Sequence, residues 1–209
     1  MITSTLWRKF VYEELSQLTL HGKILDIGGS SKLGYLDLIG GKHTIDINNI
    51  DEKYGYTLKF DLEFPWPLAN ESYDDLLAIN VLEHIFNYRH VLNESCRVLK
   101  PKGKIVIAVP FLMPIHPCPH DYWRFTEETL RKILKEAGFE NIKVKSAGSG
   151  IFSATTNLRY NVLRHVPGLW IMSAFFSRQH DRLLQAAGHG KNFGSKNYPL
   201  GYIVTANKK

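Results

Sequence analysis

Two aspartates stand twenty residues apart, each within a short apolar run, and a pair of glycines follows the first of them. These residues are Asp26 and Asp46, with Gly28 and Gly29 between them. After a buried strand, glycines permit a tight turn and let backbone amides approach a ligand, while a carboxylate about 20 residues further on can hold ribose hydroxyls. The spacing therefore admits two ligand classes, a dinucleotide such as NAD or the adenosyl group of S-adenosylmethionine.

The glycines do not complete the dinucleotide fingerprint. That fingerprint is G-x-G-x-x-G at the start of a helix, on which the pyrophosphate rests. Here Gly28 and Gly29 are followed by Ser30 and Ser31, and the next glycine is Gly34. The sequence thus disfavours the dinucleotide class.

Short apolar runs alternate with helical patterns along the chain, and such alternation predicts a doubly wound α/β fold with helices on both faces of a mostly parallel sheet. In a sheet of this kind the ligand binds at the carboxyl ends of the strands. We expect seven strands, at 23–27, 43–47, 57–62, 74–80, 103–110, 141–147 and 200–208.

Helical patterns lie before, between and after these strands. One covers 3–20, with Thr3 or Ser4 as its N-cap, and another covers 91–99. The pattern at 126–139 opens with Thr126, carries acidic residues in its first turn and ends at a glycine, which are the expected helix signals. About forty residues before the last strand lack any strand pattern and predict one or two inserted helices, the second near 171–187.

Length and composition indicate one globular domain. The chain has 209 residues, of which 44% are hydrophobic and 22% charged. Two cysteines, Cys96 and Cys118, cannot form a disulfide framework, and we expect a cytoplasmic protein. The net charge of +6 comes from scattered basic residues, which favours a solubilising surface over a nucleic-acid partner. The longest apolar stretch near the C-terminus, 166–176, is shorter than the roughly 20 residues that a membrane-spanning helix needs.

Four motifs in order along the chain resemble those of class I S-adenosylmethionine-dependent methyltransferases, and are most similar to the type 11 group of that superfamily. They are "ILDIGGS" with Ser30 in place of a family glycine, "TIDI", the stretch 60–85 that ends in "VLEHI", and "RVLKPKGKIVIAVP" with Lys102 in place of another glycine. The match runs from about residue 22 to 145. The resemblance implies a Rossmann-like methyltransferase fold over 1–209, with an N-terminal helix in 1–21, an antiparallel last strand and a helical insert or cap at 150–197.

The resemblance also assigns cofactor contacts. It implies that Asp46, at the end of the second strand, grips the ribose diol. Asp61 would receive the adenine amino group, and Asn80 would end the fourth strand beside the sulfonium. The full set of implied S-adenosylmethionine contacts is Asp26, Gly28, Gly29, Ser30, Asp46, Ile47, Asp61, Leu62 and Asn80.

The methyl acceptor is expected to lie against the loop after the fifth strand. Residues 110–130 are dense in proline, histidine and aromatic side chains, and loops at this end of the fold carry function. A hydroxyl acceptor needs a base, commonly histidine or a carboxylate. The catalytic candidates are His84, at the start of the next helix with Glu83, and His116, His120 and Asp121 in the loop, where Tyr122 and Arg124 would also line the acceptor pocket.

A metal site is the alternative for the same loop. His116, Cys118 and His120 offer nitrogen and sulfur ligands, but their alternating spacing lacks the paired form of familiar zinc sites, so no metal is predicted. For Asp121 and Arg124 the alternative is a structural ion pair.

The sequence thus predicts an S-adenosylmethionine-dependent methyltransferase that acts on a small molecule or glycan, at oxygen. The alternative is a non-catalytic S-adenosylmethionine- or S-adenosylhomocysteine-binding protein with a degenerate site, which Ser30 and the short segment between the first two strands favour. The insert mixes basic and aromatic residues, and is expected to cover the acceptor site. Peripheral membrane contact through 160–187 stays open as an alternative.

Overall fold

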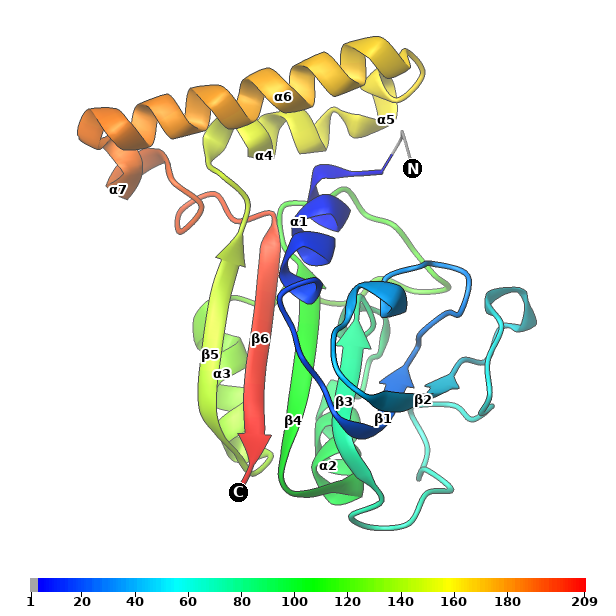
Figure 1. Ribbon diagram of the computed structural model, residues 1–209. Helices are drawn as coiled ribbons and strands as arrows, with labels where there is room; N and C mark the ends of the chain where they lie inside the picture. Colours follow the sequence, from blue (N-terminus) through cyan, green and yellow to red (C-terminus); the bar gives the residue numbers. More distant parts are fainter. Residues whose placement is uncertain (1–3) are drawn as a thin grey trace.

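A six-stranded sheet forms the centre of the molecule (Figure 1). The computed structural model describes residues 4–209. The strand order is β2-β1-β3-β4-β6-β5, and β6 runs antiparallel to both of its neighbours while the other neighbouring pairs are parallel. The strands are β1 (Gly22–Ile27), β2 (His43–Asn48), β3 (Tyr73–Ile79), β4 (Leu99–Pro110), β5 (Phe139–Ala147) and β6 (Gly201–Lys208). The predicted α/β class and the antiparallel last strand are confirmed.

The predicted strand at 57–62 is wrong, and the sheet has six strands instead of seven. This segment makes only an isolated bridge between Leu58 and Asn48. The side chain of Asn48 accepts a hydrogen bond from the amide of Phe60 at 3.0 Å and donates one to its carbonyl at 3.2 Å. Because an asparagine side chain takes the place of a neighbouring strand, no ladder forms there.

Two apolar clusters pack against the two faces of the sheet. On one face lie α2 (Tyr88–Val98) and α3 (Glu127–Glu136), which bury residues such as Leu92 and Leu134 against the sheet. On the other lies α1 (Leu6–Leu15), together with part of the helical insert. Because helices cover both faces of the sheet, its central strands are apolar on both faces. Helices on both faces were predicted and are observed.

The first helix begins and ends inside its predicted range. Its N-cap is Thr5, whose hydroxyl accepts the amide of Arg8 at 3.2 Å, and Ser4 is not the cap. Thr3 lies outside the described residues. The helix ends at Leu15, and Thr19 of the following segment forms an isolated parallel bridge with Gly40.

The start of each of the next two helices is set by its N-cap residue. Asn87 caps α2, so this helix begins at Tyr88 and not at the predicted residue 91. Thr126 caps α3 through the amide of Thr129 at 3.3 Å, as its sequence signals predict. Between β1 and β2 there is no α-helix, only a 3₁₀ turn at Leu36–Leu38.

The segment before β6 forms helices at the carboxyl end of the sheet (Figure 1). They are α4 (Ile151–Leu158), α5 (Tyr160–Leu163), α6 (Pro167–Leu184) and α7 (Gly190–Phe193), with a π turn at Gln185–His189. Trp170 of α6 is fully buried in the cluster that also contains α1. Within residues 4–209, no helix is both long enough and apolar enough to cross a membrane.

One carboxylate joins the two longer helices of this segment. Asp181 of α6 is buried and accepts the amides of Phe152 and Ser153, both at 2.9 Å. These amides belong to the first turn of α4, whose own N-cap residue, Gly150, has no side chain to satisfy them. Asp181 therefore caps α4 from the neighbouring helix.

We predict that Asp181→Ala lowers the free energy of unfolding by about 2–3 kcal/mol, because two amides lose a charged acceptor. Urea unfolding followed by circular dichroism measures this change. Asp37→Ala removes an exposed carboxylate and should change stability by less than about 0.5 kcal/mol. Equal stability losses in the two variants would show that the cap is not important.

Candidate functional site

The turn after β1 has no space for side chains. Gly28 has φ +64°, a left-handed conformation that favours glycine, and a Cβ there would lie 2.5 Å from Val81 Cγ2. A Cβ on Gly29 would lie 1.9 Å from Asp26 Oδ2. Both positions therefore require glycine, and the backbone of the turn stays bare at the tip of the strand.

Asp26 lies beneath this turn with a carboxylate that is only half satisfied. The residue is fully buried, and the Tyr35 hydroxyl donates to Oδ2. Within the described part of the chain, Oδ1 has no hydrogen-bond partner. Burial raises the pKa of Asp26 to about 7, against the opposing effect of the Tyr35 hydrogen bond. The site thus offers an acceptor for a cationic or hydrogen-bonding group of a ligand.

Ser30 ties the turn to the segment after β2. Its hydroxyl donates to the carbonyl of Tyr54 at 2.8 Å and accepts the amide of Lys32 at 3.1 Å. Ser30 is not among the residues with left-handed φ, so serine causes no backbone strain where the family has glycine. Asn49 adds a second link by donating to the carbonyl of Gly29 at 2.8 Å.

Asp46 does not end the second strand, which continues to Asn48. It is level with Leu25 in the parallel register, three residues before Gly28. Its carboxylate contacts Lys23 Nζ at 2.9 Å and accepts the Tyr73 hydroxyl at 2.8 Å. The pKa of Asp46 is lowered, because the hydrogen bonds from Lys23 and Tyr73 and the charge of Lys23 outweigh the opposing effect of burial, the largest single cause. The prediction that Asp46 ends the second strand is therefore wrong. Its predicted contact with the ribose stays a prediction.

Three further implied cofactor contacts, Ile47, Asp61 and Leu62, lie next along the chain. Ile47 is buried, and its amide donates to Thr57 Oγ1 at 2.8 Å. Asp61 is exposed, and one of its oxygens accepts the amide of Glu63 at 2.9 Å. Leu62 is buried and accepts the indole N–H of Trp66 at 3.3 Å. Asp61 is therefore accessible to a ligand, and its predicted role stays untested.

Asn80 marks the tip of β3. Its φ is +56°, unusual for a residue with a side chain. Its side-chain oxygen accepts the indole N–H of Trp7 at 2.7 Å. The amide of Trp7 is in turn 3.4 Å from Asn157 Oδ1 of α4. The N-terminal helix and the helical insert are thus joined to the strand tip.

Glu83 and His84 do not begin the next helix, contrary to expectation, but form a 3₁₀ turn at Leu82–His84. Glu83 is fully buried, and burial raises the pKa of its carboxyl to about 8. In the described part of the chain neither of its oxygens has a hydrogen-bond partner. His84 Nδ1 lies 2.5 Å from the carbonyl of His120, and burial lowers the pKa of its ring. The Nε2 atom lies 3.7 Å from Glu83 Oε1.

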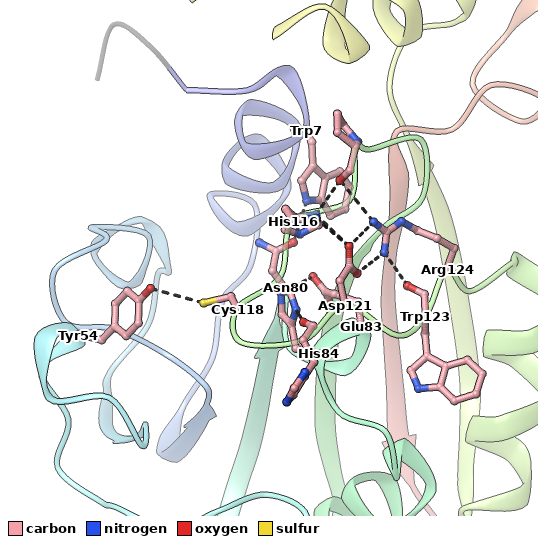
Figure 2. A network of polar contacts seen from close by, with 12 residues as sticks. Trp7, Tyr54, Asn80, Glu83, His84, His116, Cys118, Asp121, Trp123 and Arg124 are labelled. Atoms are coloured by element: carbon pink, nitrogen blue, oxygen red, sulfur yellow. Dashed lines mark hydrogen bonds and ion pairs between the residues drawn. The ribbon is translucent and has the colours of Figure 1, made fainter. Parts of the chain in front are cut away.

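The loop after β4 brings a second histidine to the same place, as Figure 2 shows. The rings of His84 and His116 lie 5.3 Å apart in an edge-to-face arrangement. Asp121 accepts the amide of His116 at 2.9 Å and lies 3.6 Å from His116 Nδ1. Arg124 binds Asp121 with two hydrogen bonds of 2.6 and 2.8 Å, and these hold the pKa of Asp121 at about 2. Asp121 and Arg124 therefore form the structural pair, and Asp121 positions His116.

Two other residues of this loop lie outside the cluster. His120 is exposed and stacks on Tyr122 with ring centroids 5.2 Å apart. Cys118 is an exposed free thiol whose sulfur lies 3.8 Å from the Tyr54 hydroxyl (Figure 2). The contact with His84 is made by the backbone carbonyl of His120, while the His120 ring lies against Tyr122.

The motif analysis missed Trp7 and Tyr35. Trp7 comes from the N-terminal helix, and Tyr35 from the segment between β1 and β2. Each donates a hydrogen bond to a predicted site residue. From the sequence, these aromatic residues indicate only core packing. No motif or spacing in the chain relates Trp7 to Asn80 or Tyr35 to Asp26.

The sheet order and the bare turn after β1 define the Rossmann-like fold of S-adenosylmethionine-dependent methyltransferases. A family model described as a methyltransferase domain matches residues 4–144, more than half of the chain. The chain belongs to this methyltransferase family.

Curated relatives match over short segments. An O-methyltransferase of Penicillium expansum is 33% identical over an 89-position alignment that covers 37% of this chain and 32% of that protein. An uncharacterised protein of Methanocaldococcus jannaschii is 49% identical over 43 residues, 21% of this chain and 19% of that protein. The chain thus spans at most a third of the length of these relatives.

Solved structures share the fold over nearly the whole chain. A methyltransferase of Thermotoga maritima, described as a possible histamine N-methyltransferase, has a TM-score of 0.58 at 17% identity, covering 98% of this chain and 92% of its own. A methyltransferase of Archaeoglobus fulgidus gives 0.57 at 18% identity, with 96% and 90% covered. Phosphoethanolamine N-methyltransferase 2 of Haemonchus contortus, solved with S-adenosylmethionine, gives 0.59 at 12%, with 97% and 52% covered. At these identities the likeness shows the fold alone.

The raised pKa of Asp26 predicts a pH dependence of stability. Between its unfolded pKa of about 4 and its folded pKa of about 7, the folded chain keeps a proton that the unfolded chain has lost. The contribution of Asp26 to the free energy of unfolding therefore falls as pH rises through this window, by about 4 kcal/mol at most. Urea unfolding of wild type and Asp26→Asn from pH 4 to 8 measures it. The variant should gain on wild type as pH rises, whereas parallel curves would contradict the assignment.

Proposed function

We propose that this chain transfers a methyl group from S-adenosylmethionine to an oxygen atom of a small-molecule or glycan acceptor. The observation that carries the proposal is the presence of two sites with unpartnered carboxyl oxygens at the tips of neighbouring strands. One is the carboxylate of Asp26 under the glycine turn, and the other is the cluster of Glu83, His84 and His116. The first suits a charged cofactor, and the second suits proton removal from an acceptor.

The residues present fit the cofactor. The methionine end of S-adenosylmethionine carries an ammonium group, which the unpartnered oxygen of Asp26 can accept. Gly28 and Gly29 leave backbone amides bare beside it, and Asp61 is accessible for the adenine amino group. When bound, S-adenosylmethionine supplies a methyl group whose carbon–sulfur bond breaks with its electron pair left on sulfur, as the acceptor oxygen forms the new bond to carbon.

The acceptor side is built to handle a proton. His84 Nδ1 is held by the carbonyl of His120, so its Nε2 atom is the nitrogen left to face the acceptor. His116 is oriented in the same way, with Nδ1 3.0 Å from the carbonyl of Pro114. Positioning of the acceptor against the cofactor supplies much of the rate in reactions of this kind. A hydroxyl acceptor must lose a proton and therefore needs such a cluster, whereas a neutral amine is already nucleophilic. The cluster thus favours methyl transfer to oxygen.

The same cluster argues against the non-catalytic alternative. A sensor needs only the cofactor contacts, and nothing in cofactor binding requires a buried carboxylate beside two histidines. Ser30, which favoured degeneracy, has a structural role without strain. A methyl-transfer screen with labelled S-adenosylmethionine against sugars, phenols, carboxylates and lipid extracts tests the function. Label transfer to a hydroxyl compound supports the proposal, and cofactor binding without any transfer favours the sensor.

The helical segment at 150–197 is proposed to cap the acceptor. Asn157 of α4 donates to the carbonyl of Leu112 at 3.3 Å, and its Nδ2 atom lies 2.9 Å from Met113 sulfur. These contacts connect α4 to the start of the loop that carries His116. Movement of α4 would therefore change the position of that loop.

We predict that Asp46→Ala weakens binding of S-adenosylhomocysteine by about 1–3 kcal/mol if its carboxylate reaches the ribose. Isothermal titration calorimetry gives the dissociation constant directly. Asp74→Ala is the matched control, because Asp74 is also paired with a lysine, Lys100 at 2.7 Å, but lies at the amino end of β3. An unchanged dissociation constant for Asp46→Ala would show that Asp46 does not bind the ribose. The asparagines that follow it in the chain would then be the candidates for this contact.

A peripheral contact of 160–187 with anionic lipid is proposed as well. Phe175 and Phe176 are 57% and 51% exposed on α6, and Arg182 is an exposed cation on the same helix. Aromatic side chains beside cations suit the headgroup region of an anionic bilayer.

We predict that the chain sediments with phosphatidylglycerol vesicles and less with phosphatidylcholine vesicles, and that added salt weakens the association. The Phe175→Ser, Phe176→Ser double variant should lose most of this binding. Ile50→Ser, which removes an apolar side chain that is 53% exposed outside the insert, should keep it. Equal sedimentation of all three proteins would refute the contact.

A further inference from the structure

Three metal-ligating side chains converge at the tips of β3 and β4. One atom from each of Glu83, His84 and His116 lies within 4.8 Å of the others. Glu83 and His84 come from the turn after β3, and His116 comes from the loop after β4 (Figure 2). These strands are neighbours in the sheet, so the grouping follows from the fold.

Glu83 is a buried carboxyl with no cation bonded to it in the described residues, so it can become an anion at low cost only if a cation binds. It is fully buried, and in residues 4–209 no group hydrogen-bonds to either oxygen. Arg124 does not supply the charge through a bond, because both of its terminal nitrogens bind Asp121. An unpaired buried charge is costly, and buried charges in proteins are paired or coordinate metals.

Both histidines are held as metal-ligating histidines are. A bound histidine usually bonds its other ring nitrogen to a carbonyl or carboxylate, which fixes the ring and its tautomer. His84 Nδ1 lies 2.5 Å from the carbonyl of His120, and His116 Nδ1 lies 3.0 Å from the carbonyl of Pro114. In each ring the Nε2 atom is left for a ligand. Asp121, held by Arg124, adds a carboxylate 3.6 Å from His116 Nδ1.

We propose that Glu83, His84 and His116 bind a divalent transition-metal ion, and that the acceptor hydroxyl of the proposed methyl transfer occupies its open coordination position. Two imidazoles and one carboxylate suit zinc, cobalt or iron better than magnesium. Three protein ligands leave a fourth position free, as in catalytic zinc sites. This inference rests on the proposed function for its substrate, an alcohol or phenol.

The metal explains how a weakly acidic hydroxyl becomes reactive. An oxygen bound to a divalent ion has a strongly lowered pKa, so the acceptor releases its proton to solvent on binding. With the ion bound, the Nε2 atoms of His84 and His116 act as ligands, and the metal replaces them in activating the hydroxyl. The charges also balance, because the ion offsets Glu83 and the acceptor oxyanion, while Asp121 and Arg124 offset each other. This site differs from the predicted alternative of His116, Cys118 and His120, and shares only His116 with it.

Metal binding is measured first without any cofactor or acceptor. The full chain, free of a histidine tag and stripped with a chelator, is titrated with Zn²⁺ by calorimetry and with Co²⁺ by visible absorption. We expect one equivalent to bind, with cobalt bands typical of low coordination number. His116→Ala and Glu83→Gln should weaken binding about tenfold or more. His180→Ala, which removes an exposed histidine of α6, should leave it unchanged.

The outcomes separate this inference from the proposed function. Glu83→Gln keeps the side-chain shape, so circular dichroism and S-adenosylhomocysteine binding should match wild type while metal binding weakens about tenfold or more. Absence of stoichiometric binding in the wild type, or equal binding by wild type, His116→Ala and Glu83→Gln, overturns the metal site. Cofactor binding and methyl transfer by the chelator-treated wild type would leave the proposed function standing and overturn the metal.

Discussion

The buried carboxylate of Asp26 occupies the space that a side chain at position 29 would need. This steric constraint determines the structure of the turn at the proposed cofactor site. Because a Cβ on Gly29 would lie 1.9 Å from Asp26 Oδ2, the turn can carry only backbone there. Val81 closes the space above Gly28 in the same way, at 2.5 Å. The chain therefore pairs a bare backbone with a buried, partly unsatisfied acid, and that pairing suits a cationic ligand.

The residues proposed to contact the acceptor are positioned by the same strand tips. Val81, which closes the space above Gly28, begins the short stretch that carries Glu83 and His84. On the other side, Asn80 is held by Trp7 of α1, and α1 is joined to α4. The groups proposed to bind the cofactor and the acceptor are thus positioned by one set of contacts between three parts of the chain that are distant in sequence. This arrangement agrees with a fold that brings two substrates together.

Sequence patterns predicted the mostly parallel sheet and the presence of α1, α2, α3 and α6, because apolar runs and caps are local signals. Thr126 illustrates this, since its hydroxyl caps α3 as predicted. The failures have non-local causes. The expected strand at 57–62 is replaced by a side-chain link from Asn48, and Asp46 is engaged by Lys23 and Tyr73 before the strand ends. The grouping of Glu83 with His116 depends on neighbouring strand tips, which no spacing in the chain encodes.

The most direct test of the central claim is a crystal structure of the chain with S-adenosylhomocysteine. We predict electron density for adenosine across the tips of β1, β2 and β3, with the amino acid end of the ligand beside Asp26 and Gly29. Strand tips that stay empty at saturating ligand, or that are filled by the protein's own side chains, would contradict the account.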